Sequence, residues 1–149
     1  MSLAKTRDIG SYITTRCSDL ASLTTSTDGS EIDGAFVDRT GFLSAKLVLA
    51  YEAALGDGKT LTIAANLQDD SSSGGSGTDY GTAYSATVVS TGGTGGTTNR
   101  GVVELDFDLS GAKQYIRPQY TPTLSATSAD TVIIGAVLVL GGGPVLPAA

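Results

Sequence analysis

Three carboxylates alternate along one segment of the chain, and their spacing is the first pattern that suggests chemistry. Glu104, Asp106 and Asp108 are separated by single apolar residues, so on a β-strand they share one face and lie about 7 Å apart in succession. Pairs of carboxylates at such distances hydrolyse glycosides when a binding platform holds the sugar. No aromatic platform accompanies these residues in the sequence. The pattern therefore favours an acidic, solvent-exposed strand face.

A second group of carboxylates, Asp69, Asp70 and Asp79, offers hard oxygen ligands of the kind that calcium prefers. Their spacing matches no loop with defined ligand positions. A solvated acidic loop is the better interpretation, and we expect neither a metal nor another cofactor.

Two glycine-rich segments resemble parts of nucleotide-binding loops. The first is Gly56-Asp57-Gly58-Lys59-Thr60, but Ala53 stands where a phosphate-binding loop needs its first glycine, and a strand pattern follows instead of a helix. The second, Gly92 to Gly96, lacks the strand-turn-helix context of a dinucleotide fold. Both segments are more typical of turns between strands.

Composition excludes several classes of function. The chain has no histidine and a single cysteine, Cys17, so Ser-His-Asp and Cys-His catalysis are excluded, and we interpret Cys17 as a reduced cytosolic thiol. The net charge of -6, without a Lys/Arg cluster, argues against capture of nucleic acid or anionic membranes. No apolar run approaches the length of a membrane span, and no signal peptide is evident. We expect a protein that is not an enzyme.

Alternating polar and apolar residues predict a chain made of strands. A length of 149 residues with 20 glycines favours one all-β domain, a single antiparallel β-sandwich or jelly-roll-like barrel. The expected strands are Glu31 to Asp38, Ala45 to Ala54, Thr60 to Gln68, Ala83 to Val89, Val102 to Leu109, Gln114 to Tyr120 and Thr131 to Leu140.

Turn residues predict how these strands connect. Gly56-Asp57-Gly58 predicts a hairpin connection, and Ser110-Gly111-Ala112 predicts a hairpin between the strands on either side of it. Pro118 cannot donate a hydrogen bond, so its part of the strand is expected at a sheet edge or a bulge. The segments Asp69 to Gly77 and Ser90 to Asn99 are expected to be flexible loops.

The segment Thr131 to Leu140 is apolar on both faces. One face carries Val132, Ile134, Ala136, Leu138 and Leu140, and the other carries Ile133, Val137 and Val139. The second face of a strand in a β-sandwich is normally exposed to solvent. Because the second face of this segment is apolar, we expect it to be covered by an arm or loop of the same chain or by another subunit. Ile133, Val137 and Val139 are therefore candidate interface residues.

Residues 1–27 form a polar stretch that we assign to an N-terminal arm, with the sandwich domain spanning residues 28–149. The arm has few apolar residues, and a short helix over residues 9–16 is conceivable, although β-branched residues weaken it. We expect Ile9, Tyr12 and Ile13 to contact a partner surface. A frayed terminus is the alternative.

Several strand-end motifs resemble a family of small structural proteins of tailed bacteriophages, the capsid decoration or cement type. They are RTGFLSAKLV at residues 39–48, LQDDSS at residues 67–72, SGAKQYIR at residues 110–117 and the closing LGG at residues 140–142. The resemblance covers residues 29–147. It implies a virion protein made in the host bacterial cytoplasm that binds the major capsid protein on the capsid surface, as a homo-oligomer and commonly a trimer.

A binding module is the alternative to a capsid decoration protein. A β-sandwich of a phage tail or fibre that recognises carbohydrate or another protein would use the Gly/Ser-rich loops as adaptable contacts.

Overall fold

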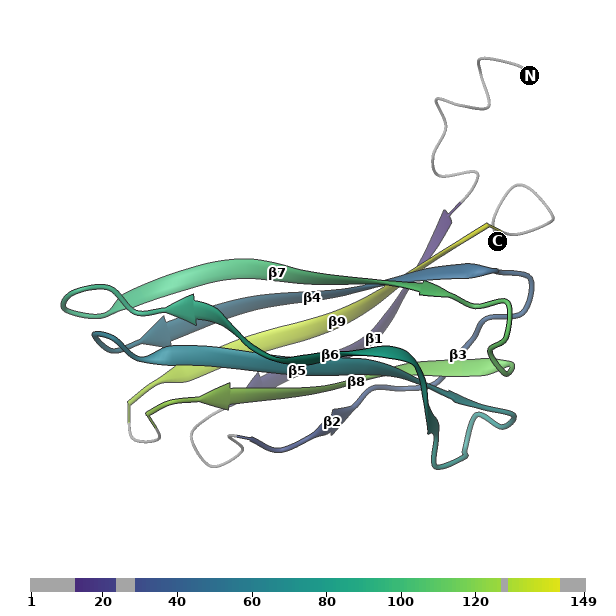
Figure 1. The fold of residues 1–149 in the computed structure, drawn as a ribbon, viewed down its shortest axis with the longest axis horizontal. Helices are drawn as coiled ribbons and strands as arrows, with labels where there is room; N and C mark the ends of the chain where they lie inside the picture. The colour runs from purple at the N-terminus through teal and green to yellow at the C-terminus, as the bar shows by residue number, and fades with distance from the viewer. Residues whose placement is uncertain (1–12, 24–28, 127–128, 143–149) are drawn as a thin grey trace, which may run out of the picture.

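β-strands make up the regular structure of the described residues (Figure 1). In the computed structural model, residues 13–23, 29–126 and 129–142 are described. Within them the strands are β1 (Ile13–Leu23), β2 (Ile32–Asp33), β3 (Val37–Asp38), β4 (Ser44–Leu55), β5 (Thr60–Asp70), β6 (Thr78–Thr91), β7 (Thr97–Asp108), β8 (Tyr115–Leu124) and β9 (Thr131–Gly141). No helix long and apolar enough to cross a membrane occurs in this described part.

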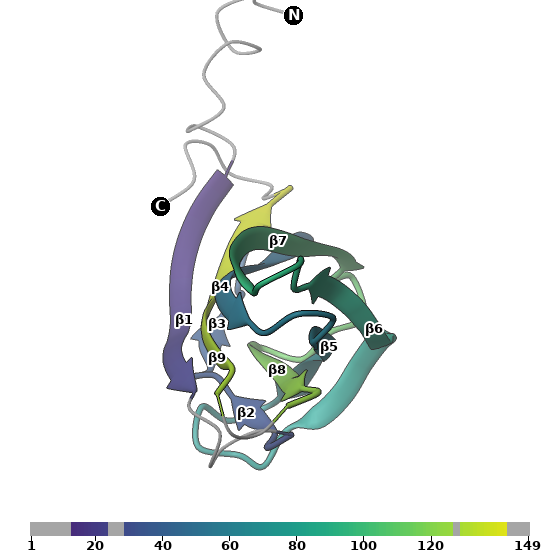
Figure 2. The ribbon, with the colours of Figure 1, turned by 90° about the vertical axis from the view of Figure 1, so that its left-hand side faces the viewer.

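The strands form two antiparallel sheets that pack face to face as a sandwich (Figure 2). The first sheet has the order β1-β9-β4-β7, and the second has the order β2-β8-β5-β6, with β3 also paired to β8. If β2 and β3 are counted as one interrupted strand, the orders become 1-8-3-6 and 2-7-4-5. This is the double Greek-key order of a jelly roll, and the all-β sandwich prediction is confirmed.

The core forms where the inward-facing residues of the two sheets meet. The inward set predicted for β5, namely Leu61, Ile63, Ala65 and Leu67, is buried. The same holds for the inward face of β9, with Val132, Ile134, Ala136, Leu138 and Leu140. Full burial of a Leu or Ile side chain stabilises the fold by about 1.5–3 kcal/mol before entropy is counted. The period-2 pattern therefore identified the core faces of these strands.

Strands β7 and β8 do not form the predicted hairpin. Strand β7 pairs with β4, and β8 pairs with β5, so the turn at residues 109–114 crosses from one sheet to the other. The Gly56-Asp57-Gly58 turn is similar: the N–H of Lys59 donates to the carbonyl of Gly56 over 3.0 Å, yet β4 and β5 belong to different sheets. A tight turn can join two paired strands of one sheet or two strands of different sheets. Both hairpin predictions were wrong because turn residues do not determine which strands pair.

Pro118 lies in β8, opposite Leu67 of β5. Its carbonyl accepts a hydrogen bond from the N–H of Gly34, in the gap between β2 and β3. The N–H and C=O of one residue in an antiparallel strand point to the same side, so the missing donor of Pro118 also faces this gap. The expected strand Glu31 to Asp38 is accordingly two short segments, and the proline is tolerated where the edge strand is interrupted.

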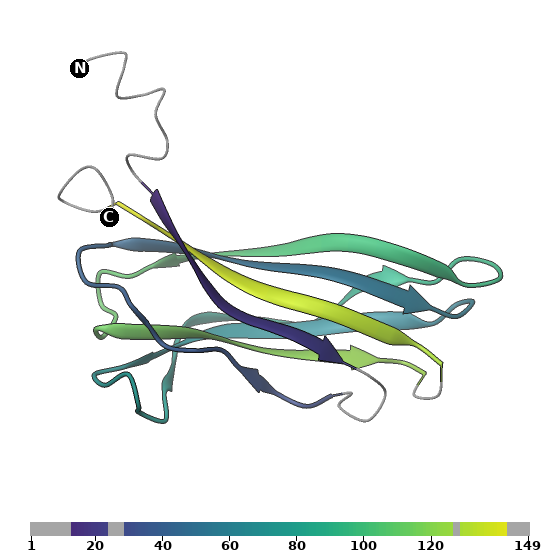
Figure 3. The same ribbon diagram turned by 180° about the vertical axis from the view of Figure 1, so that it is seen from behind.

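Strand β1 runs along β9 at the edge of the first sheet (Figure 3). Its register joins Ile13 to Gly141 and Leu23 to Val132, with an irregularity between Cys17 and Asp19. The helix considered for residues 9–16 is therefore wrong for residues 13–16, because the open edge of β9 offers hydrogen bonds to a β-branched segment that favours extended backbone. Residues 9–12 lie outside the described residues, and the boundary between arm and sandwich stays a prediction.

Candidate protein interface on the first sheet

The outward face of the first sheet carries a continuous apolar area. In the register of the sheet, Val48 lies opposite Val137, and Ala50 lies opposite both Gly135 and Val102. Val102 is 56% exposed and Ile133 is 49% exposed. We define the outer patch as Val48, Ala50, Val102, Ile133 and Val137. Contiguous apolar area on a sheet face is typical of a protein interaction site.

Charged pairs flank the outer patch along the strands. On one side, Nζ of Lys46 lies 2.8 Å from Asp106 and 3.4 Å from Glu104. On the other side, Nε of Arg100 lies 2.6 Å from the carboxylate of Glu52. Exposed ion pairs of this kind add little stability. They frame the apolar area with polar groups, as at the rim of many interfaces.

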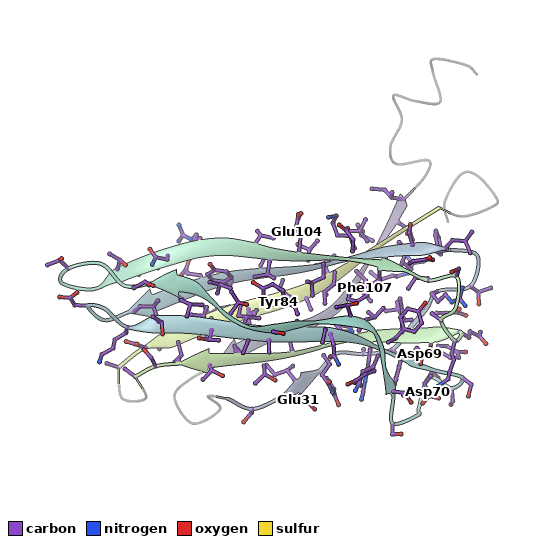
Figure 4. All side chains as sticks on the ribbon, viewed as in Figure 1. Glu31, Asp69, Asp70, Tyr84, Glu104 and Phe107 are labelled. Atoms are coloured by element: carbon purple, nitrogen blue, oxygen red, sulfur yellow. The ribbon has the colours of Figure 1, made fainter. Side chains whose placement is uncertain are left out.

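The three alternating carboxylates of β7 are exposed, as the sequence indicated. Figure 4 shows Glu104 on the outer side of β7. Lys46 contacts Glu104 and Asp106, whereas Asp108 accepts a hydrogen bond from the N–H of Ser110, and this bond lowers the pKa of the Asp108 carboxyl. The hydrogen bond to Asp106 raises the pKa of Lys46. The bond from Ser110 favours the ionised form of Asp108, and all three carboxylates lie on an exposed strand face.

A groove of about 640 Å³ opens at the end of the first sheet where β1 begins and β9 ends. We call it the end groove. One side of it is apolar, with Ile13, Leu43 and Val139. The other side is acidic, with Asp106 and Asp108, and its remaining lining residues are Ser44, Ala45, Lys46, Phe107 and Gly141.

The candidate interface residues within the described part of the chain lie on one surface without forming one cluster. Ile133, Val137 and Val139 occupy the second face of β9, Ile133 near its start and Val139 at the end groove. Ile13 lines the same groove, so the fold brings it to Val139 from the far end of the chain. Ile9 and Tyr12 lie outside the described residues. The interface role of all six residues remains a prediction.

The sequence pattern of β9 alone did not identify the residues of β4 and β7 that complete the outer patch. Val48 and Ala50 stand at outward positions of Ala45 to Ala54, between Lys46 and Glu52. Apolar residues at outward positions were the available signal. Val102 joins them only through the register of β4 with β7.

The carboxylates considered as calcium ligands each accept hydrogen bonds from other groups of the protein. The Asp69 carboxylate accepts from the N–H of Lys113 over 2.9 Å, and Asp79 accepts from the amide of Gln68. Asp70 accepts from the N–H groups of Ser72 and Gly77, and these bonds lower its pKa. Among the described residues, no group of three metal-ligating side chains gathers.

Arg117 anchors the loop after β5 on the second sheet. Its guanidinium donates to Gln68 over 2.9 Å and to the carbonyl of Ser76 over 2.7 Å, and it lies 2.8 Å from the carboxylate of Asp33. The same group lies over the ring of Phe36, 4.7 Å from its centroid. The loop expected to be flexible is therefore tied to the sheet by charge-assisted hydrogen bonds.

The two glycine-rich segments, residues 56–60 and 92–96, form turns that pack closely against each other. The N–H of Gly92 donates to the carbonyl of Lys59, and its own carbonyl accepts from Gly58. A Cβ at Gly92 would lie closer to the carbonyl oxygen of Gly56 than the 3.0 Å that real Cβ contacts keep. The two segments that resembled nucleotide-binding loops thus pack against each other, and these N–H groups are used within the fold.

Comparison with known proteins finds no matching family model and no matching curated protein. Among solved structures, the chain is similar to one of infectious bursal disease virus, strain Gx, with 17% identity and a TM-score of 0.47, covering 91% of this chain and 33% of the other. It is also similar to the 2.6 Å structure of T=1 particles derived from infectious bursal virus, with 18% identity and a TM-score of 0.46, covering 91% and 32%. The chain thus spans about a third of the length of these proteins. At this identity and TM-score, neither likeness bears on function.

Proposed function

We propose that this chain is a non-enzymatic structural protein of a virion that binds the assembled capsid surface and stabilises it. The observation that supports the proposal is the outer patch, an exposed apolar area on a hydrogen-bonded sheet with charged pairs on both sides. Such a surface suits adhesion to another protein, because it buries apolar area without requiring the sheet to rearrange. The resemblance of the strand-end motifs to capsid decoration proteins points to the same role.

Adhesion stabilises a shell by mass action. A ligand that binds the assembled capsid and not its separated subunits lowers the free energy of the assembled state. Contact with several subunits at once makes the second and later contacts intramolecular, so modest individual affinities combine into firm attachment. We expect the major capsid protein to be the partner, the capsid surface to be the location and a homo-oligomer, favoured as a trimer, to be the binding form.

The alternative is a phage tail or fibre module that recognises carbohydrate or another protein. Jelly rolls occur among both viral capsid domains and lectins, so the fold itself does not separate the two roles. A binding module of this kind would need adaptable Gly/Ser-rich loops for its contacts. The Gly/Ser-rich loop after β5 is instead held in place by hydrogen bonds with Asp70 and Arg117. We therefore favour capsid adhesion.

The test uses capsids of the encoding phage that lack this protein. Purified chain is added, and binding is measured by co-sedimentation while capsid melting is followed by calorimetry. We expect wild-type protein to bind and to raise the capsid melting temperature. The double variant Val102→Lys, Val137→Lys should lose most of this binding, because it buries two charges in the contact.

The matched control is Thr87→Lys, which adds a lysine at an exposed position of β6 on the second sheet. It should bind like wild type. Absence of binding by the wild-type chain, or equal binding by the double variant after circular dichroism confirms its fold, would overturn the proposal.

A further inference from the structure

The end groove combines an apolar side with an acidic side. Leu43 is 51% exposed there, next to Ile13 and Val139. On the opposite side, the side chain of Asp106 is 78% exposed and that of neighbouring Glu104 is 56% exposed, although both contact Lys46. One lysine amine facing two carboxylates, with Asp108 beside them, leaves this side net negative. A complementary occupant carries apolar side chains and positive charge.

We propose that the end groove binds the N-terminal segment, residues 1–12, of a second copy of this chain. The proposal deepens the homo-oligomer expected under the proposed function, and it does not require a capsid. The N-terminal segment thereby has a binding site, and the end groove has a basic, partly apolar occupant.

The composition of residues 1–12 matches the groove. The segment holds two of the nine basic residues, Lys5 and Arg7, and one of the fifteen acidic residues, Asp8. Its side-chain charge is therefore +1, which leaves -7 for the other 137 residues of a chain with net charge -6. Its apolar residues include Leu3, Ile9 and Tyr12. A basic, partly apolar segment of an acidic chain is attracted to an acidic, partly apolar groove.

The path of the chain favours a second copy as the source of the segment. Ile13, the residue that follows the segment, lines the groove of its own copy and pairs with Gly141. Folding back into that groove would require a reversal next to Ile13. A fully extended segment of 12 residues reaches up to about 40 Å, enough to lie in the groove of a neighbour. In a closed symmetric assembly every groove then receives a neighbour's segment.

The test compares charge-reversed variants of the segment and of the groove by sedimentation velocity over a range of concentrations. Wild type should associate. Deletion of residues 1–12, the variant Lys5→Glu, Arg7→Glu and the variant Glu104→Lys, Asp106→Lys should each raise the dissociation constant by about tenfold or more. The control Lys59→Glu changes charge in the β4–β5 turn, away from the groove (Figure 1), and should associate like wild type.

Mixing the two charge-reversed variants distinguishes exchange between copies from docking within one copy. In an equimolar mixture, the acidic segment of one variant faces the basic groove of the other, and the basic segment of the second faces the acidic groove of the first. We expect the mixture to associate more tightly than either variant alone, because two of the three segment–groove contacts in a mixed trimer are then complementary in charge. No recovery on mixing, or unchanged association after deletion of residues 1–12, would overturn the inference. Failure of capsid binding alone would leave these results unaffected, because no capsid is present.

Discussion

The hydroxyl of Tyr51 donates a hydrogen bond to the backbone carbonyl of Val89, 2.8 Å away. This bond joins β4 of the first sheet to β6 of the second. The ring of Tyr51 also lies against Gly101 of β7, where a Cβ would collide with it. Burial raises the pKa of the Tyr51 hydroxyl, which keeps it a donor. One side chain thus links the two sheets where β6 passes over to β7.

Replacing Tyr51 with Phe should destabilise the fold by about 1 kcal/mol, because the Val89 carbonyl loses its partner while the ring packing remains. Urea unfolding measures the change. The control is Tyr115→Phe, whose hydroxyl only accepts a long 3.4 Å bond from Gln114 at the surface, and it should change stability by less than about 0.5 kcal/mol. Equal effects of the two variants would show that the link between the sheets contributes nothing.

Replacing Gly92 with Ala should destabilise the fold by about 2–4 kcal/mol, because the added methyl collides with the Gly56 carbonyl and separates two turns that are hydrogen-bonded. The control is Gly74→Ala, where a Cβ meets open space. Thermal unfolding of both variants checks the expectation. A Gly92→Ala protein as stable as the control would mean that the two turns separate at no cost.

Acid should weaken the fold through Asp38, Asp70 and Asp108. Hydrogen bonds to Thr40, Ser72 and Ser110 respectively lower the pKa values of their carboxyls in the folded state. The unfolded chain therefore binds protons more readily, so this stabilisation is present above the unfolded pKa, about 3.9, and is lost as pH falls through the folded values. Urea midpoints measured down a pH series should decline most steeply below about pH 4.

Asp70→Asn isolates one of these carboxyls. The variant should be less stable than wild type near neutral pH and should lose less stability on acidification, because one of the three groups no longer titrates. A pH dependence identical to that of wild type would rule out a contribution from the Asp70 contacts with the loop after β5.

Asp130 is buried, and only one of its carboxylate oxygens has a hydrogen-bond partner, the N–H of Gly56 at 2.9 Å. Asp130→Asn keeps an acceptor for Gly56 and removes a buried charge, so it should be at least as stable as wild type near neutral pH. Asp130→Ala removes the acceptor and should cost about 1–3 kcal/mol. Calorimetry that showed Asp130→Asn to be less stable than wild type, or as unstable as Asp130→Ala, would contradict this expectation.

The sequence by itself determined which face of most strands turns inward. The alternation in Thr60 to Gln68 and the apolar face from Val132 to Leu140 identified buried residues, because the direction of a side chain in a strand depends only on its position along that strand. The same local rule identified Ile133, Val137 and Val139 as a second apolar face and the carboxylates of β7 as an exposed row. Pro118 was expected at a discontinuity for a second local reason, its missing N–H donor.

Only the tertiary structure decided which strands pair and therefore which surface residues meet. Strand β7 pairs with β4 and not with β8, the strand that follows it in sequence. Residues 13–16 belong to a strand that pairs with β9. Alternation is satisfied by any partner of suitable length, so it carries no information about sheet order. Ala50 and Val102 adjoin in the outer patch, and Ile13 and Val139 in the end groove, because the jelly-roll order brings together segments that no local pattern connects.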